Sequence, residues 1–470
     1  MINRRKFLKG SFAGGLGVAS GLATNFASFN AFSADTSDYK ALVCVFLAGG
    51  MDTHDTLIPT DRDSSSRYES LRSQMLSSYD RRPDGFSRRR RNDLLSLNNA
   101  DVDGRTFGFP QELRPLQELF NQGELSVVGS VGPLIEPLNR TQFNNGTRRV
   151  PARLGSHNDS TSIWMASQPE GAQAGWGGRF SDIMQAANAN TNASFASVSA
   201  AGRQIFLTGE QTNGFEVSTS GGLSVDHLNS NNFLGSSSFA SSYQSILMDA
   251  QRNNNDPALS AFGRDIGDTL RTSIVANELL SEQLAVGGSL ATNFPNSSLG
   301  QQLEVVARMI SRRQGLGVGR QVFFVQQSGY DTHRNQPNNL PALQQDLANS
   351  LRAFYDSTVE LGISENVTSF TASDFGRALQ PSRNGTDHGW GSHHMVIGGA
   401  VNGGQIIGDI PPPILGHDFD QGRGRVIPQV SVDQYAGALG SWYGLNQSQI
   451  REALPAIVNF DESALNGLFS

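Results

Sequence analysis

Five short apolar stretches, each bounded by glycine or polar residues, constrain the fold of this chain more than any other feature. They do not alternate apolar and polar residues, as a strand with one face in water would. Continuous apolarity of this kind is typical of strands in a parallel sheet that is covered on both faces. The stretches are ALVCVFLAGG at 41–50, LSVVGSVG at 125–132, QVFFVQQSG at 321–329, NVTSFTAS at 366–373 and HMVIGGAV at 394–401.

Helical patterns lie between these stretches. Apolar residues recur at helical spacing in residues 341–362, and residues 299–315 show the same pattern. Strands that alternate with helices predict an α/β fold with a mostly parallel central sheet. Residues 186–256 differ, because they are rich in Ser, Asn, Ala and Gly with Phe and Leu interspersed. We expect them to form an insertion or cap on a single domain that spans residues 34–470.

The first 33 residues resemble an export signal. Arg4 and Arg5 precede Phe7 and Leu8, and a weakly apolar stretch without acidic residues follows. This pattern predicts a twin-arginine signal peptide, cleaved near residue 33, with the twin-arginine translocase as partner during export. An ordinary basic amphipathic helix is the alternative. Four glycines dilute the apolar stretch, so we expect no stable membrane span. The mature protein would be periplasmic or secreted.

Charge argues against a nucleic-acid partner, and the cysteine content excludes sites built from several cysteines. The leader holds four of the 36 Lys and Arg and none of the 43 Asp and Glu, so the remaining chain has a net charge of −11. This argues against a nucleic-acid partner, which needs a basic face. The basic run at 88–91 lies beside Asp80, Asp84 and Asp93 and is interpreted as a solvated segment. Cys44 is the only cysteine, which excludes an internal disulfide and a cysteine-built zinc site.

Three of the expected strands are followed by an aspartate at nearly the same offset. These residues are Asp52, Asp331 and Asp374. Sites in open α/β sheets form outside the carboxyl ends of the strands, so we expect these carboxylates to converge. Their mutual repulsion would be severe without a cation. Each residue also has a structural alternative: Asp331 could stabilise a turn, and Asp374 could cap a helix.

Histidines accompany these aspartates. His54 follows Asp52, His333 follows Asp331, and His388 belongs to the stretch GTDHGWGSHH at 385–394. Carboxylates with neutral imidazoles suit zinc, manganese or iron, whereas carboxylates alone suit magnesium or calcium. We therefore expect one or two divalent metal ions. Zinc or manganese is favoured, and calcium or magnesium is possible.

The same stretch contains a pair of adjacent histidines, His393 and His394. Neighbouring side chains on a strand point to opposite faces, so at most one of the two can face the site. We assign that role to His394 as a candidate catalytic residue.

Several longer motifs resemble the bacterial, twin-arginine-exported domain-of-unknown-function family 1501, which is placed in the alkaline-phosphatase-like superfamily. The resemblance covers nearly the whole mature chain. The motifs are LVCVFLAGGMDTHDTLIP at 42–59, FFVQQSGYDTHRNQ at 323–336, FTASDFGRAL at 370–379 and the segment 385–409, together with residues 107–132 and GWGGRFSDIM at 175–184.

This resemblance implies an α/β/α sandwich that carries a two-metal hydrolase site. Asp331 and His333 would bind one metal, Asp52 and Asp374 the other, and His388 would complete the site. The implied substrate is a small anionic ester of phosphate or sulfate, or a polysaccharide. The alternative is a non-catalytic, metal-binding envelope or surface-assembly protein.

A nucleophile in this superfamily should lie at a helix start after the second strand. GSHNDSTSIWM at 155–165 fits best and offers Ser156 and His157 as candidate catalytic residues. The positive end of a helix would help to hold an anion and to lower the pKa of a hydroxyl group. Alternatively, Ser156 only caps the helix. No sulfatase-type modification motif surrounds Cys44.

Overall fold

The computed structural model describes residues 34–83, 88–221, 261–286 and 288–470, and Ala34–Ser470 forms one compact unit. The expected leader at 1–33 lies outside the described residues, as do residues 222–256 of the Ser/Asn-rich stretch. Within the described ranges, no helix is long and apolar enough to cross a membrane.

A nine-stranded sheet forms the centre of the described structure. Its order is β11-β5-β10-β9-β1-β8-β6-β7, with β12 paired to β5. Only β10 runs antiparallel to its neighbours among these strands, so the predicted mostly parallel sheet is confirmed. The strands are β1 (Lys40–Ala48), β5 (Leu125–Gly132), β6 (Ser197–Ser199), β7 (Phe215–Glu216), β8 (Arg320–Ser328), β9 (Val367–Ser373), β10 (Ser392–Ile397), β11 (Ile406–Ile407) and β12 (Val430–Ser431).

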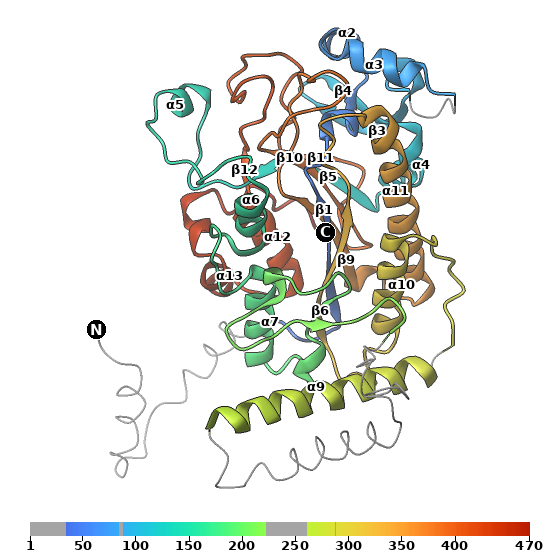
Figure 1. The fold of residues 1–470 in the computed structure, drawn as a ribbon, viewed down its shortest axis with the longest axis vertical. Coiled ribbons are helices and arrows are strands. Elements are labelled where there is room, and N and C mark those ends of the chain that lie inside the picture. The colour runs from blue at the N-terminus through green and yellow to red at the C-terminus, as the bar shows by residue number, and fades with distance from the viewer. Residues whose placement is uncertain (1–33, 84–87, 222–260, 287) are drawn as a thin grey trace, which may run out of the picture. The chain divides into compact units, whose positions relative to one another are not determined.

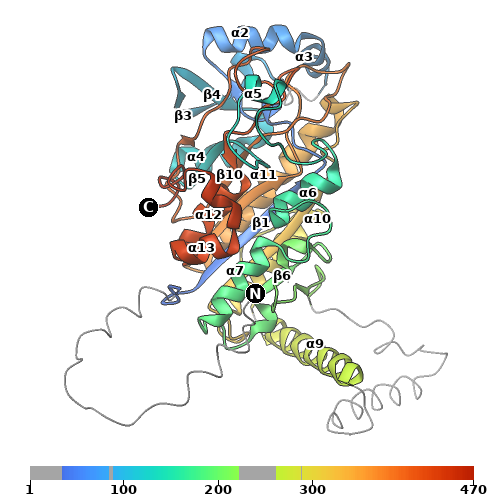
Figure 2. The ribbon, with the colours of Figure 1, turned by 90° about the vertical axis from the view of Figure 1, so that its left-hand side faces the viewer.

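Helices cover both faces of this sheet (Figure 1). One face packs against α4 (Arg114–Gln122), α10 (Ser298–Ser311) and α11 (Gln336–Glu360). The other packs against α6 (His157–Ala166), α7 (Trp176–Ala186), α12 (Val432–Tyr443) and α13 (Gln447–Ala453), which Figure 2 shows from the front.

Strand β1 shows why the apolar stretches are continuous. Val43 and Val45 belong to the core under α10 and α11, whereas Leu42 and Phe46 belong to the core on the opposite face. Successive side chains of a strand point to opposite faces, so a strand buried on both sides needs apolar residues throughout. Cys44 lies in this strand, and burial raises the pKa of its thiol well above the usual value.

A smaller antiparallel sheet and several short elements complete the described structure. The small sheet has the order β2-β4-β3. Its strands are β2 (Ile58–Pro59), β3 (Leu95–Val102) and β4 (Arg105–Phe109), and the remaining helices are α2 (Arg62–Leu71), α3 (Ser73–Asp80), α5 (Arg140–Asn144) and α9 (Ala261–Val286). The 3-10 helices are η3 (Thr53–Asp55), η4 (Arg91–Asp93), η5 (Gln111–Leu113), η6 (Ala193–Phe195), η7 (Ile205–Leu207), η9 (Ser364–Asn366) and η10 (Pro455–Asn459).

The described part of the expected insertion at 186–256 contains two short strands. Strand β6 pairs with β8 and strand β7 pairs with β6, so both extend the main sheet. That residues 186–256 form an insertion or cap stays a prediction. Strand β6 has the sequence SVS and β7 only FE, so both are too short and too polar to show the apolar continuity of the other strands.

Candidate functional site

The carboxyl ends of three neighbouring strands carry the predicted aspartates. Strand β1 lies between β8 and β9 and is parallel to both, with Ala48 beside Ser328 and Leu47 beside Ser373. The segments that follow these strands therefore emerge at one edge of the sheet. Each aspartate, however, has different partners at this edge.

Asp374 follows β9 directly and is held by the backbone of the turn after β1. The amides of Gly49 and Gly50 both donate to its Oδ1 at 2.9 Å. These glycines have φ of +116° and +85°, and a Cβ on Gly49 would lie 2.3 Å from the backbone nitrogen of Asp331. Only glycine therefore fits this turn. The second oxygen of Asp374 lies 2.5 Å from Nδ1 of His157.

His157 is the first residue of α6, and its ring lies between two carboxylates. Nδ1 donates to Asp374, because a carboxylate can only accept. Nε2 therefore faces Asp331, with 3.7 Å to Oδ2 of that residue. The hydrogen bond to Asp374 raises the pKa of His157, and the negative charges of Asp374 and Asp331 add to this effect.

Asp331 contacts a buried arginine that the sequence analysis missed. Arg377 donates to Oδ1 of Asp331 and to the carbonyl oxygens of Gly49, Gly50 and Thr386. Partial burial alone would raise the pKa of Asp331, but the hydrogen bond and charge of Arg377 lower it below its usual value. Arg377 thus ties the turn after β1 to the loop that carries His388.

His333 and His388 meet at the same oxygen of Asp331. Their Nε2 atoms lie 3.1 Å and 3.2 Å from Oδ1, and 2.9 Å from each other. Nδ1 of His388 lies 2.7 Å from the carbonyl oxygen of Gly155, so Nδ1 carries the proton. Burial lowers the pKa of His388, which favours the neutral ring with a lone pair on Nε2.

Two imidazole rings turn their Nε2 atoms toward the Asp331 carboxylate. Nε2 of His388 and Nε2 of His157 both face Asp331. In the neutral tautomer fixed by Nδ1 neither has a proton to donate, and the raised pKa of His157 favours the charged ring, in which a proton lies between its Nε2 and Asp331. Such groups repel each other unless a proton or a cation lies between them. Among the residues that the structure describes, His157, Asp331 and His388 are the group whose donor atoms, within 4.8 Å of one another, could hold a metal ion.

The distances among Asp331, His388 and the neighbouring His333 fit metal coordination. With metal–ligand bonds of about 2.1 Å, neighbouring ligand atoms lie about 3.0–3.4 Å apart in octahedral or tetrahedral geometry. The three distances among Asp331 Oδ1, His333 Nε2 and His388 Nε2 are 2.9, 3.1 and 3.2 Å. The four side chains of Asp331, His157, His333 and His388 are 25–47% exposed, so a ligand from solvent can reach them. We call these four side chains the His/Asp group.

A further acidic residue near the His/Asp group comes from the stretch at 385–394. Oδ1 of Asp387 lies 3.6 Å from Nδ1 of His333, and its Oδ2 accepts from Arg423 at 2.6 Å. The Asp387 carboxylate thus lies behind the His333 ring, on the side away from Asp331. Its place directly before His388 in the sequence did not indicate this contact with His333.

Asp52 lies in a separate, fully buried ion cluster. Arg72 donates to both of its oxygens, at 2.7 Å and 3.2 Å, and the side-chain amide of Gln336 donates at 2.6 Å. Burial raises the pKa of Asp52, although the charge of Arg72 opposes the shift. These partners already occupy the oxygens that would bind a second metal. Asp55 shares Arg72 and Gln336 with Asp52.

The buried ion cluster is hydrogen-bonded to the two loops that carry the His/Asp group. Oε1 of Gln336 accepts from the hydroxyls of Thr332 and Thr386, which flank the residues of the His/Asp group. Gln336 therefore links Asp52 to both loops. The sequence could not reveal this role, because the partners of Gln336 come from segments far apart in the chain.

The two adjacent histidines on β10 point in opposite directions, as predicted, but neither belongs to the His/Asp group. Nδ1 of His393 accepts from the amide of Ser130 at 3.0 Å. The ring of His394 lies in the core, with its centroid 4.8 Å from the Trp164 ring and 6.0 Å from the Tyr435 ring. Burial lowers the pKa of both histidines to about 3. The structure therefore gives His394 a packing environment and no partner in the His/Asp group.

Ser156 directly precedes His157, but its hydroxyl bonds to Asp159 and not, among the described residues, to the His/Asp group. It occupies the N-cap position of α6 without a capping side-chain hydrogen bond. Its hydroxyl donates to Oδ2 of Asp159 at 2.8 Å. His54 also lies apart, in η3, and burial lowers its pKa to about 3.

Comparison with known proteins identifies a family for this chain. A family model described as "Protein of unknown function (DUF1501)" matches residues 39–454. No curated protein matches the chain.

Proposed function

The chain belongs to the DUF1501 family of proteins of unknown function. From the geometry of its candidate site we propose that it is a metal-dependent hydrolase of phosphate or sulfate esters. The observation that carries this proposal is the direction of two imidazole nitrogens. Hydrogen bonds at Nδ1 turn Nε2 of His157 and of His388 toward the Asp331 carboxylate. Nε2 of His388 is an acceptor there, whereas the raised pKa of His157 favours a proton on its Nε2, which a metal ion would replace.

The His/Asp group would hold one divalent metal ion. Three imidazoles and one carboxylate suit zinc or manganese better than magnesium or calcium, which prefer oxygen ligands. A bound ion supplies a Lewis acid that polarises a phosphoryl or sulfuryl oxygen. Because Arg72 and Gln336 occupy the oxygens of Asp52, we propose one metal and not two.

The residues of the chain would orient an anionic ester beside this group. The N-terminus of α6 begins at His157, so the positive end of a ten-residue helix lies next to the proposed metal ligands. Asp374 holds the His157 ring in place, and Arg377 holds Asp331. Since the hydroxyl of Ser156 is engaged by Asp159, we propose that water attacks the ester and that the alcohol leaves.

The type of α/β fold is a second argument for an ester hydrolase. We propose that the fold is alkaline-phosphatase-like, because helices cover both faces of a mostly parallel sheet and the His/Asp group lies at the carboxyl ends of its strands. Fold similarity alone gives only a prior for function, so the proposal rests on the His/Asp group.

The decisive experiment combines metal analysis with an ester screen. We expect the purified protein to bind about one equivalent of zinc or manganese, and to hydrolyse an aryl phosphate, phosphodiester or sulfate in its presence. Ser156→Ala should keep this turnover, because the serine contacts Asp159 and not the His/Asp group. Firm metal binding without turnover of any ester would favour a non-catalytic envelope or surface-assembly protein. Absence of metal binding would refute both functions.

We also propose that the protein is exported to the periplasm or beyond by the twin-arginine translocase, on the basis of Arg4 and Arg5. Replacing both residues with lysine should leave the unprocessed precursor in the cytoplasm, because the translocase reads the arginine pair. Immunoblots of cell fractions measure this. Normal accumulation of the processed double variant outside the cytoplasm would disprove twin-arginine export.

A further inference from the structure

A cavity of about 390 Å³ with a mixed polar and apolar lining lies at the opposite end of the sheet from the His/Asp group. Its lining residues include Ser194, which precedes β6, and Asn213, which precedes β7. Both strands run parallel within the part of the sheet that contains β8. The cavity therefore lies at the amino ends of these strands, whereas Asp331 follows the carboxyl end of β8.

A single carboxylate on α7 fixes one wall of this cavity. Asp182 accepts from the backbone amides of Glu210, Gln211 and Thr212, at 2.6, 3.2 and 2.7 Å. Three hydrogen bonds to one charged group hold the loop in a defined conformation. Gln211, Thr212 and Asn213 therefore line the cavity from a preorganised loop.

Helix α7 also supplies an acceptor without a partner. Gln185 lies three residues after Asp182, on the same side of the helix, and lines the cavity. Its Oε1 is buried, and no hydrogen-bond donor reaches it from the described residues. An unpaired buried acceptor is unfavourable, so a ligand that donates a hydrogen bond there would be stabilised.

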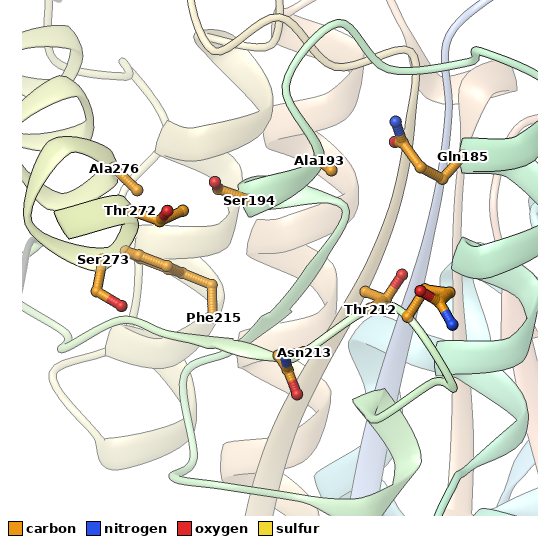
Figure 3. Close-up of a pocket in the computed structure, with 11 residues that line it drawn as sticks. Gln185, Ala193, Ser194, Thr212, Asn213, Phe215, Thr272, Ser273 and Ala276 are labelled. Carbon is orange, nitrogen blue, oxygen red and sulfur yellow. The ribbon is translucent and has the colours of Figure 1, made fainter. Parts of the chain in front are cut away.

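The chemistry of the lining selects an uncharged ligand rich in hydroxyl groups. Figure 3 shows the hydroxyl side chains of Ser194, Thr272 and Ser273 near Phe215, with the amide of Gln185 on the opposite side of the cavity. None of the side chains that line this first cavity is charged. Amides and hydroxyls both donate and accept, as the hydroxyls of a sugar do. Phe215 packs at 5.1 Å, edge to face, on Phe195, which holds its ring as an apolar surface for the C–H face of a sugar.

We propose that this cavity binds a neutral saccharide. A second cavity of about 230 Å³ shares Ser194, Thr272 and Ala276 with the first and continues along α9, where its lining adds Arg271. The two cavities together offer room for more than one sugar unit, with the neutral unit in the first cavity. This site does not depend on the proposed hydrolase activity, because it shares no residue with the His/Asp group.

Saccharide titrations of the full mature protein test the proposal. The probes are maltotriose, cellotriose and chitotriose, measured by isothermal titration calorimetry and saturation-transfer NMR. We expect at least one to bind with a Kd on the order of 10⁻⁴–10⁻³ M. The variant Gln211→Ala/Asn213→Ala should weaken binding by about tenfold, because it removes two amides that hydrogen-bond the sugar.

Matched controls separate this site from the rest of the surface. Gln74→Ala/Gln345→Ala removes two exposed amides outside the cavity and should leave the affinity unchanged. Asp331→Asn should also leave it unchanged, since Asp331 lies at the other end of the sheet. The proposal is overturned if no probe binds, if both amide double variants bind equally, or if binding is lost with Asp331→Asn.

Discussion

Asp331→Asn is expected to weaken zinc binding by at least about two orders of magnitude while the protein stays folded. Asp331 is the carboxylate at which three imidazole nitrogens meet, at 3.1, 3.2 and 3.7 Å. Asparagine keeps the shape of the side chain but removes the negative charge that balances a divalent ion. Competition with a chromophoric chelator measures the affinity, the visible spectrum of the cobalt form reports the ligand set, and circular dichroism confirms the fold.

Two further variants show whether the effect is specific to the His/Asp group. His388→Ala should weaken zinc binding to a similar extent, because it removes one nitrogen of the group. His417→Ala should not, although His417 is also a partly buried loop histidine, because its Nδ1 only accepts from the amide of Phe419. Unchanged affinity in Asp331→Asn would rule out the His/Asp group as a metal site.

Asp52→Asn tests whether Asp52 only pairs with Arg72, as in the structure, or binds a second metal ion, as the sequence predicted. The variant should lose stability, because Arg72 is left partly unpaired in a buried cluster. The folded fraction should still bind zinc with unchanged affinity. A loss of one metal equivalent from folded protein would restore Asp52 as a ligand.

The sequence predicted the framework of the site well, because strand ends have a local signal. Each apolar stretch became a strand of the main sheet, and β5 spans the predicted residues 125–132. The convergence of Asp331, His333 and His388 follows from the order and direction of these strands, together with one loop. Periodicity and strand-end aspartates therefore sufficed for this part of the site.

The remaining contacts depend on long-range packing that no local pattern records. Asp52 is engaged by Arg72, which comes from the end of α2, and nothing in the sequence marked this arginine as its partner. The partner of His157 is Asp374, more than two hundred positions away in the chain. His394 was assigned to the site because of its neighbours in sequence, but the strand directs its ring into the core. Alternation along β10 predicted that the two histidines point to opposite faces of the strand. It could not predict which residues surround each of them.

The second large effect is expected from Asp374→Asn, a change in a residue that does not itself join the His/Asp group. In the wild type, Asp374 accepts the proton on Nδ1 of His157, so the neutral ring that a metal ion would bind has its lone pair on Nε2. An asparagine amide would donate to Nδ1 and so stabilise the opposite tautomer, with the proton on Nε2 facing Asp331. We expect zinc affinity to fall about 10–100-fold, and turnover of any ester substrate to fall with it.

The matched control for Asp374→Asn is Asp420→Asn. Asp420 is also buried and also accepts from glycine amides, those of Gly416, Gly422 and Gly424. Asp420→Asn should therefore lower the free energy of unfolding by about 1–3 kcal/mol without changing zinc affinity. Proton NMR adds a direct readout, because the short hydrogen bond from Nδ1 of His157 should give a downfield resonance that Asp374→Asn removes. Equal zinc affinities in the two variants would show that Asp374 only supports the fold. A selective loss in Asp374→Asn would show that it sets the tautomer on which the His/Asp group depends.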